Sequence, residues 1–244
     1  MKKLTGYLTP KLPDNAFTID LANAMFDAGM DALEIGAPFS DPIADGATIE
    51  KASHLALRNG FIFDDLKVIS AALKGRDLIW MGYTNPFLRR GMEKTVKEAA
   101  ALGVSALVIP DLPHEEAQTY RSLFQENKLD LIEFIAPTTP KDRIAKILRG
   151  AKKFIYLVAY AGVTGAAQSE DLQEILAAIK AVSQTPVYVG FGVNRGTAKA
   201  RAKGADGVIA GSCFVKILLD DALSNNEKIK RICDEARAIK EAIA

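Results

Sequence analysis

The sequence predicts an α/β protein that folds as a single (β/α)8 barrel, a TIM barrel, over residues 1–244. Short apolar runs alternate with longer helical patterns eight times, and several runs are continuous Val, Ile and Leu, as in strands covered on both faces. The units repeat about every 25 to 30 residues without a Ser- or Gly-rich linker. An open doubly wound sheet is the alternative, and the even spacing favours the barrel.

The expected elements follow from these patterns in chain order. The apolar runs predict strands over residues 4–9, 32–36, 78–82, 106–110, 131–136, 154–158, 187–190 and 207–211. The amphipathic stretches between them predict helices over 17–28, 63–73, 92–102, 115–125, 141–148, 171–182 and 198–203, and a last helix over 226–243. Active sites on such barrels gather at the carboxyl ends of the strands, so the residues that follow each strand are the candidates for function.

The second strand and the loop after it carry two candidate catalytic carboxyl groups. Strand side chains alternate between faces, so Glu34 shares its face with the small residues Ala32 and Gly36. The turn-forming loop that follows contains Asp45. An enclosed carboxyl and a more solvated one at the same opening would have pKa values that differ, as acid–base catalysis requires. The alternative is that Glu34 is a buried, paired structural carboxylate and that Asp41 and Asp45 are turn residues that cap the next helix.

The ends of the seventh and eighth strands predict a phosphate-binding site. The first is Gly190-Phe191-Gly192 and the second is Gly211-Ser212. Glycines leave backbone N–H groups uncovered, and loops after these two strands are the usual place for phosphate on this architecture. Each turn taken alone is also explained by tight backbone geometry or by helix capping.

The sixth strand contributes a candidate side chain and is followed by a candidate lid. Tyr156 shares a face with Phe154 and Val158, so its hydroxyl would reach the substrate if that face lines the barrel; a Tyr bonded to backbone is the alternative. The small residues over 159–168 are typical of a segment that closes over a substrate. Glu133, in the fifth strand, is the other strand carboxylate, and its inward or outward placement stays open.

Several chemistries are disfavoured by what the strand ends lack. No Lys lies at a carboxyl end of an expected strand, which argues against a Schiff-base aldolase. The two histidines, His54 and His114, fall at expected helices, so an imidazole-based metal site is not expected. Cys213 and Cys233 lack metal or redox spacing and are expected to be reduced. Carboxylate acid–base work on a phosphorylated substrate is the chemistry that fits.

Composition and charge limit the classes of molecule that the protein is expected to bind. The chain has 31 Lys and Arg against 30 Asp and Glu, a net charge of +1, with no block of like charge. Binding to nucleic acid or to a membrane surface is therefore not expected. The first residues contain no long apolar core before Pro10, which argues against a signal peptide or membrane span and for a cytoplasmic protein.

The chain resembles the α subunit of tryptophan synthase. The resemblance is carried by Glu34-Ile35-Gly36-Ala37-Pro38-Phe39-Ser40-Asp41-Pro42-Ile43-Ala44-Asp45-Gly46, by Gly162-Val163-Thr164-Gly165, and by Gly190-Phe191-Gly192-Val193 followed by Gly211-Ser212. It implies cleavage of indole-3-glycerol phosphate to indole and glyceraldehyde 3-phosphate, with no metal or organic cofactor in this subunit. It further implies an α2β2 heterotetramer in which indole passes to a pyridoxal-phosphate β subunit.

The resemblance also implies roles for individual residues. Glu34 would be the general acid/base and Asp45 the second catalytic carboxylate. Gly165, Gly192, Gly211 and Ser212 would hold the phosphate, within the turn formed by Gly190 and Phe191. Tyr156 and Thr164 would position Glu34, the substrate and the lid, and Asp41 would face the β subunit or couple to the loop of Thr164.

The chain departs from the family's pattern in three places. Thr9-Pro10-Lys11-Leu12-Pro13 stands where relatives usually carry Gly-Asp-Pro, and no helix precedes the first strand. Ala159-Tyr160 opens the lid where a serine is common. Two other functions stay open: a catalytically weak partner that activates the β subunit, or another phosphosugar isomerase or synthase on the same barrel.

Overall fold

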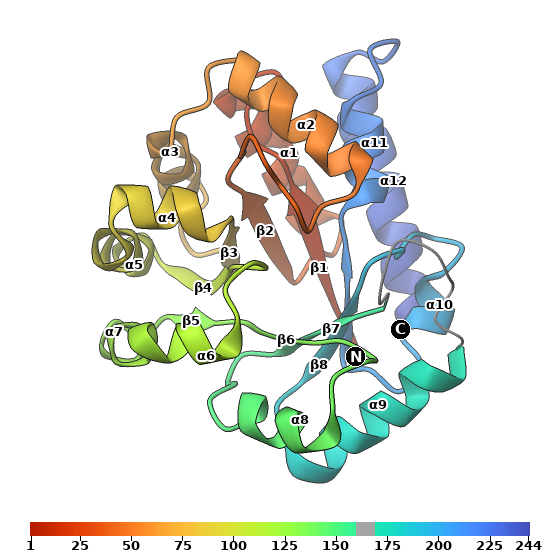
Figure 1. The fold of residues 1–244 in the computed structure, drawn as a ribbon. Helices are drawn as coiled ribbons and strands as arrows, with labels where there is room; N and C mark the ends of the chain where they lie inside the picture. Colours follow the sequence, from red (N-terminus) through yellow and green to blue (C-terminus); the bar gives the residue numbers. More distant parts are fainter. Residues whose placement is uncertain (160–168) are drawn as a thin grey trace.

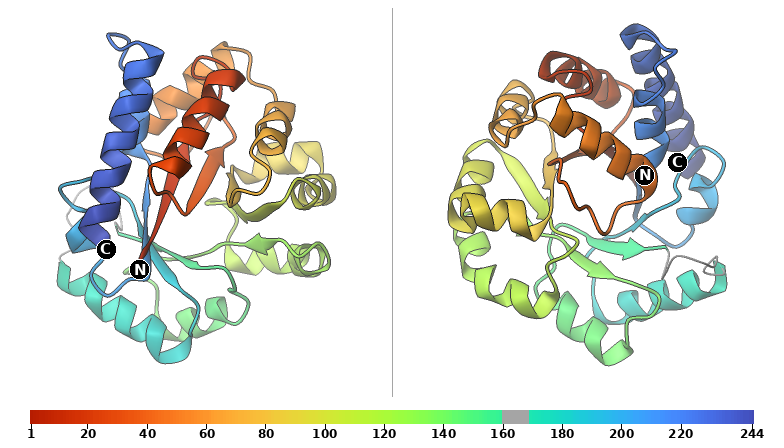
Figure 2. Two further views of the ribbon diagram at one scale, coloured as in Figure 1. Left: turned by 180° about the vertical axis from the view of Figure 1, so that it is seen from behind. Right: turned by 45° about the horizontal axis from the view of Figure 1, so that its top comes forward.

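All the strands in the computed structural model run parallel in one sheet; the structure describes residues 1–159 and 169–244. They occur in the spatial order β5-β4-β3-β2-β1-β9-β8-β7-β6. β5 and β6 are consecutive pieces of one barrel strand, so the order closes into a ring of eight strands. Figures 1 and 2 show the barrel. The strands are β1 (Lys3–Leu8), β2 (Ala32–Gly36), β3 (Leu78–Met81), β4 (Val104–Val108), β5 (Asp130–Leu131), β6 (Glu133–Ile135), β7 (Ile155–Val158), β8 (Val187–Gly190) and β9 (Gly207–Ala210).

The fifth strand differs from the expected continuous run over 131–136. Its first piece pairs with β4 and its second with β7. Between them, the Ile132 N–H still donates to the Leu107 carbonyl oxygen at 2.9 Å. The first part of this barrel strand therefore pairs with β4 and the second part with β7, and the change occurs after Ile132.

Helices surround the barrel, as Figure 1 shows. They are α1 (Asn15–Asp27), α2 (Ala47–Arg58), α3 (Asp64–Ala72), α4 (Thr84–Arg90), α5 (Met92–Ala101), α6 (His114–Ala117), α7 (Arg121–Glu126), α8 (Lys141–Leu148), α9 (Ser169–Val182), α10 (Ala198–Arg201), α11 (Ser212–Leu218) and α12 (Asn225–Ile243). The helix expected over 115–125 is interrupted by a 3-10 turn, Gln118–Tyr120.

The α2 helix contains His54, as the sequence suggested, whereas α4 lies where a polar turn was expected. The α2 helix begins after Gly46 and has Glu50 in its first turn and Arg58 in its last, charges that suit the helix dipole. In α4, Pro86 falls in the first turn, where a missing N–H costs no helical hydrogen bond. The Asp111 carboxylate accepts the Thr84 N–H at 2.8 Å at the start of this helix. A capping hydrogen bond from a residue distant in the sequence therefore stabilises a helix that the local sequence does not predict.

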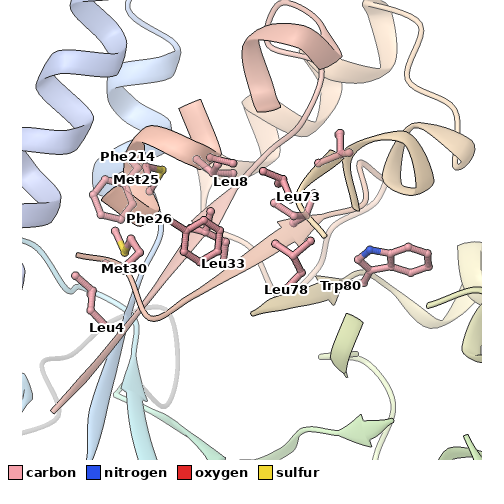
Figure 3. Close-up of a cluster of buried hydrophobic side chains, with 14 of the residues drawn as sticks. Leu4, Leu8, Met25, Phe26, Met30, Leu33, Leu73, Leu78, Trp80 and Phe214 are labelled. Atoms are coloured by element: carbon pink, nitrogen blue, oxygen red, sulfur yellow. The ribbon is translucent and has the colours of Figure 1, made fainter. Parts of the chain in front are cut away.

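The hydrophobic core has two parts, one between the sheet and the helices and one inside the barrel. The outer core packs the outward faces of β1, β2 and β3 against helices, and Figure 3 shows Leu4, Leu33 and Leu78 in it, with Phe214 from α11. Trp80 is fully buried there, and its indole N–H donates to the Ser70 hydroxyl at 2.9 Å. The inner cluster contains Tyr7, Ile79, Val108, Tyr156 and Ile209. These side chains fill the interior of the barrel beneath the carboxyl ends of the strands.

The end of the barrel at which the strands begin is closed by charge pairs near the chain termini, which lie close together in Figures 1 and 2. Asp31 accepts hydrogen bonds from the Leu4 N–H at 2.8 Å and from Lys3 at 3.0 Å, and Lys240 of α12 donates to it as well. These bonds lower the pKa of Asp31 despite its partial burial, which by itself would raise it. None of the described helices is long and apolar enough to cross a membrane.

Candidate active site

A cavity of about 230 Å³ opens at the carboxyl ends of the strands. Strands from all round the barrel contribute to it, together with the loops after β2, β8 and β9. Its lining contains Tyr7, Glu34, Ala44, Asp45, Gly46, Ala47, Thr48, Ile49, Met81, Val108, Pro110, Phe134, Tyr156, Phe191, Gly192, Val193, Ile209, Gly211 and Ser212. The expected carboxyl groups, Tyr156 and the two glycine-containing turns therefore meet in one cavity.

Glu34 reaches the cavity from the middle of β2. It pairs in register with Tyr7 of β1 and Ile79 of β3, and only 2 % of its surface is exposed. Its Oε1 atom has no hydrogen-bonding partner among the described residues. Burial, with a smaller contribution from the charge of Asp45, raises the pKa of Glu34 to about 8. The group is therefore protonated at neutral pH, and one of its oxygens is free to meet a ligand.

Asp45 lies in the loop after β2 and is held by a tyrosine that the sequence did not single out. The Tyr83 hydroxyl donates to Asp45 Oδ2 at 2.9 Å and accepts the Ala44 N–H at 3.0 Å. Burial raises the pKa of Asp45 to about 6, and the bond from Tyr83 opposes that rise. Asp45 is consequently ionised at pH 7 while Glu34 keeps its proton, so the two carboxyl groups hold different states at one pH.

Aromatic rings form the walls between these groups. Tyr156 stacks on Phe134 with ring centroids 4.9 Å apart and meets Phe191 edge-on at 6.2 Å. Gly190 does not line the cavity; it makes room for the ring, because a Cβ there would lie 2.3 Å from Tyr156 Cε1. Tyr7 is likewise buried, with its hydroxyl against Gly36, where a Cβ would lie 2.2 Å away. These surfaces suit a flat apolar ring.

The side of the cavity near β8 and β9 offers backbone N–H groups. Phe191 and Gly192 both have positive φ, 72° and 69°, and two such residues in succession form a concave turn. Gly211 and Ser212 lie beside them at the start of α11. Thr164 and Gly165, with residues 160–168 of the expected lid, lie outside the described residues.

Sequence reasoning did not single out Tyr7, which lines the cavity, or Tyr83, which holds Asp45 without lining the cavity itself. Tyr7 lies near the carboxyl end of β1, and Tyr83 lies two residues after β3, so position at a strand end was the available signal. The departure at Thr9-Pro10-Lys11 lies just beyond Tyr7. There Lys11, with φ 64°, forms an ion pair with Asp65 at 3.3 Å, which ties this turn to α3.

Glu133 points away from the cavity, which settles the placement that the sequence left open. It contacts His114 Nδ1 at 3.0 Å and Arg121 at 3.3 Å on the helical side of β6. Its strand neighbour Ile135 packs in the cluster under α8 and α9, on the same side. In residues 1–159 and 169–244 no group of three or more His, Cys, Asp or Glu side chains is arranged to hold a metal ion.

The fold and the cavity together define a class of protein. A closed parallel barrel that carries titratable carboxyl groups of raised pKa in a cavity at the strand ends is a TIM-barrel enzyme. The paired states of Glu34 and Asp45 indicate acid–base chemistry at that cavity.

Comparison with known proteins identifies the family. The family model described as "Tryptophan synthase alpha chain" matches residues 1–244. The tryptophan synthase alpha chain of Wolinella succinogenes is 51 % identical over 245 residues, covering 100 % of this chain and 96 % of the relative. The chain belongs to the tryptophan synthase alpha chain family.

Solved structures agree with this assignment. Tryptophan synthase from M. tuberculosis in its aminoacrylate-bound form matches with a TM-score of 0.88 at 32 % identity, covering 100 % of this chain and 94 % of the other. Tryptophan synthase subunit alpha from Legionella pneumophila matches with a TM-score of 0.90 at 29 % identity, covering 99 % and 92 %.

The expected family, barrel fold and activity are thereby confirmed. The protein is an indole-3-glycerol phosphate lyase of tryptophan biosynthesis. Alpha chains of this family use no cofactor of their own, because the pyridoxal phosphate of tryptophan synthase belongs to the β subunit. The alternative of another phosphosugar isomerase or synthase on this barrel is therefore wrong.

Proposed function

We propose that Glu34 and Asp45 carry out the cleavage of indole-3-glycerol phosphate in this chain. The reaction needs a proton delivered to indole C3 and a proton removed from the hydroxyl on the adjacent side-chain carbon. Glu34 serves both steps in turn. Its raised pKa keeps the proton available at neutral pH, and its unpartnered Oε1 is the atom that meets the substrate.

The steps balance in protons and electrons. Protonated Glu34 gives its proton to C3, which leaves a cationic ring nitrogen. The Glu34 carboxylate then takes the proton of the hydroxyl, the carbon–carbon bond breaks, and its electron pair returns to the ring. Indole leaves with a hydrogen on C3, glyceraldehyde 3-phosphate carries the new aldehyde, and Glu34 ends protonated as it began.

Asp45 stabilises the cationic intermediate. An ionised carboxylate that accepts the ring N–H offsets the positive charge, and the effect is large where water is excluded. The hydrogen bond from Tyr83 holds Asp45 in place and favours its charged form. Tyr83 thus acts as a positioning residue for the second carboxylate.

The phosphate is bound by peptide groups rather than by a cation. Gly192, Gly211 and Ser212 present backbone N–H groups at one side of the cavity, with Gly190 and Phe191 shaping the first turn. Gly165 and Thr164 are proposed to complete the site from the segment over 160–168. The aromatic wall of Tyr156 and Phe134 then takes the indole ring.

One observation carries the proposal: a buried carboxyl with a free oxygen shares a cavity with an ionisable carboxylate whose pKa is lower. The test is the dependence of kcat/KM on pH, measured by indole release from indole-3-glycerol phosphate. We expect a bell-shaped profile with limbs near pH 6, where Asp45 ionises, and near pH 8, where Glu34 loses its proton. A profile flat from pH 5 to 9 would contradict the assignment.

We also propose that the chain works as the α subunit of an α2β2 heterotetramer and passes indole to the β subunit in the cytoplasm. The loop between Phe39 and Asp45 is a reasonable contact surface, because Ile43 is 81 % exposed and Asp41 is exposed beside it. The test is a titration with purified β subunit, followed by indole release. Ile43→Asp should weaken the stimulation without altering the basal rate; equal stimulation of both proteins would exclude this loop.

A further inference from the structure

The phosphate-binding turn after β8 has a backbone conformation that needs external support. Phe191 has a φ of 72°, a left-handed conformation that is energetically unfavourable for a residue with a side chain. Gly192 continues the turn with a φ of 69°. Such a turn persists only where its surroundings determine it, and its N–H groups bind an anion only in that conformation.

One support is local. The Thr197 hydroxyl donates to the Gly192 carbonyl oxygen at 2.6 Å and accepts the Asn194 N–H at 3.0 Å. The Asn194 carbonyl also accepts the Thr197 and Ala198 N–H groups at 3.0 and 2.9 Å. These hydrogen bonds tie residues 192–198 together. A shift of one residue in this segment therefore shifts the others.

The second support comes from the C-terminal helix. Glu235 of α12 is 7 % exposed, and its Oε1 accepts the backbone N–H of Arg195 at 2.9 Å. Its Oε2 accepts a hydrogen bond from Arg195 Nε, so the buried carboxylate is neutralised by the same residue. Burial raises the pKa of the Cys213 thiol to about 12, and the negative charge of Glu235 adds to that rise. Cys213 directly follows Ser212 in the chain. Glu235 therefore bonds directly to the segment that follows the first glycine turn, and its helix packs against α11, which begins at the second.

We infer that Glu235 is a positioning residue for phosphate binding: its carboxylate fixes the Arg195 backbone and, through the Thr197 hydrogen bonds, the Phe191–Gly192 turn. The inference rests on the proposed phosphate site. It explains why a carboxylate beside an anion site does not repel the anion, since Arg195 cancels its charge. By the same inference, α12 contributes to substrate affinity through Glu235, although no residue of α12 lines the cavity.

The experiment compares ligands that carry either end of the substrate. For Glu235→Ala we expect the Kd of glycerol 3-phosphate and the KM for indole-3-glycerol phosphate to rise about tenfold, the effect of one lost hydrogen bond to a charged group. The Kd of indole and kcat should change less than about twofold. Glu235→Gln should restore phosphate affinity to within about threefold, because its amide oxygen still accepts the Arg195 N–H.

Matched variants separate positioning from loss of structure. Asp234→Asn removes an exposed carboxylate that pairs with Lys230 on the same helix and should leave all four constants unchanged. Thr197→Val breaks the local hydrogen bonds with almost no change of volume and should reproduce the phosphate-specific loss, even if Glu235→Ala does not fold. Equal weakening of indole and glycerol 3-phosphate binding, or unaltered phosphate affinity in either Glu235→Ala or Thr197→Val, would overturn the inference. Failure of the wild-type chain to bind glycerol 3-phosphate would instead refute the phosphate site itself.

Discussion

The substitution Glu34→Gln tests the central step of the mechanism with the least structural change. Glutamine has nearly the same volume, and at pH 7 it replaces a group that is already about nine-tenths neutral, since the pKa of Glu34 is about 8. Its amide cannot donate a proton to C3 and then take one back. General acid–base catalysis contributes about 10²- to 10⁴-fold, so kcat should fall by at least a hundredfold, or ~2.7 kcal/mol in the barrier.

The assay is single-turnover indole release together with substrate binding at equilibrium. Affinity for indole-3-glycerol phosphate should stay within about threefold, because the cavity walls and the phosphate turns are untouched. Turnover that survives within about tenfold of wild type, a change of only ~1.4 kcal/mol, would refute Glu34 as the acid–base group. A loss of binding equal to the loss of rate would show that the side chain serves affinity instead.

The same variant has a stability consequence with a defined sign. The pKa of Glu34 is higher in the folded chain than the ordinary value of 4.5, so the folded state holds this proton more tightly than the unfolded state. The stability that this provides is complete below pH 4.5 and is lost as pH rises to about 8. Glu34→Gln should therefore have a higher Tm than wild type at pH 8 and lose that advantage at pH 5, as measured by thermal unfolding at both values.

Three further substitutions follow from the site. Asp45→Asn should lower kcat by about 10²-fold, an electrostatic loss of the kind seen when one stabilising group is removed, with KM little changed; a stopped assay of indole checks it, and a drop under threefold would contradict the role of Asp45. Tyr83→Phe removes the bond that opposes the pKa rise of Asp45, so the acid limb of kcat/KM should move above pH 6; an unmoved limb would mean that Tyr83 does not act through Asp45. Gly190→Ala places a Cβ 2.3 Å from Tyr156, so kcat/KM should fall at least tenfold while far-ultraviolet circular dichroism keeps the barrel signature; full activity would show that the ring can yield.

Fold and catalytic candidates were both predictable from local sequence, for physical reasons. Alternation along β2 puts Glu34 on the face opposite Leu33 and Ile35, and the turn formers after Gly36 force a loop that contains Asp45. The two glycine turns could be predicted to lie together, because the parallel strands of a barrel all end at the same rim. Each of these inferences depends on residues within about a dozen positions of one another.

Other features depended on contacts between distant segments. The α4 helix begins where Asp111 caps Thr84, 27 residues away, and no local signal announces that partner. Glu133 is the clearest case, because the pattern of β5 and β6 allowed either face, and only His114 and Arg121 on the helical side decided it. Alternation gives the face of a strand but not which face is inside.

Sequence alone thus predicted the barrel, the pair Glu34 and Asp45 as candidate catalytic groups, and the two glycine turns that we propose bind phosphate. The tertiary structure alone decided the states of these groups: the pKa values of about 8 and about 6 arise from burial by other strands and from Tyr83, which is 38 residues from Asp45. It alone revealed the hydrogen bond from the Arg195 N–H to Glu235, 40 residues away. The physical reason is that desolvation and hydrogen bonding depend on what surrounds a group in space, whereas periodicity and turn chemistry depend on its neighbours in the chain.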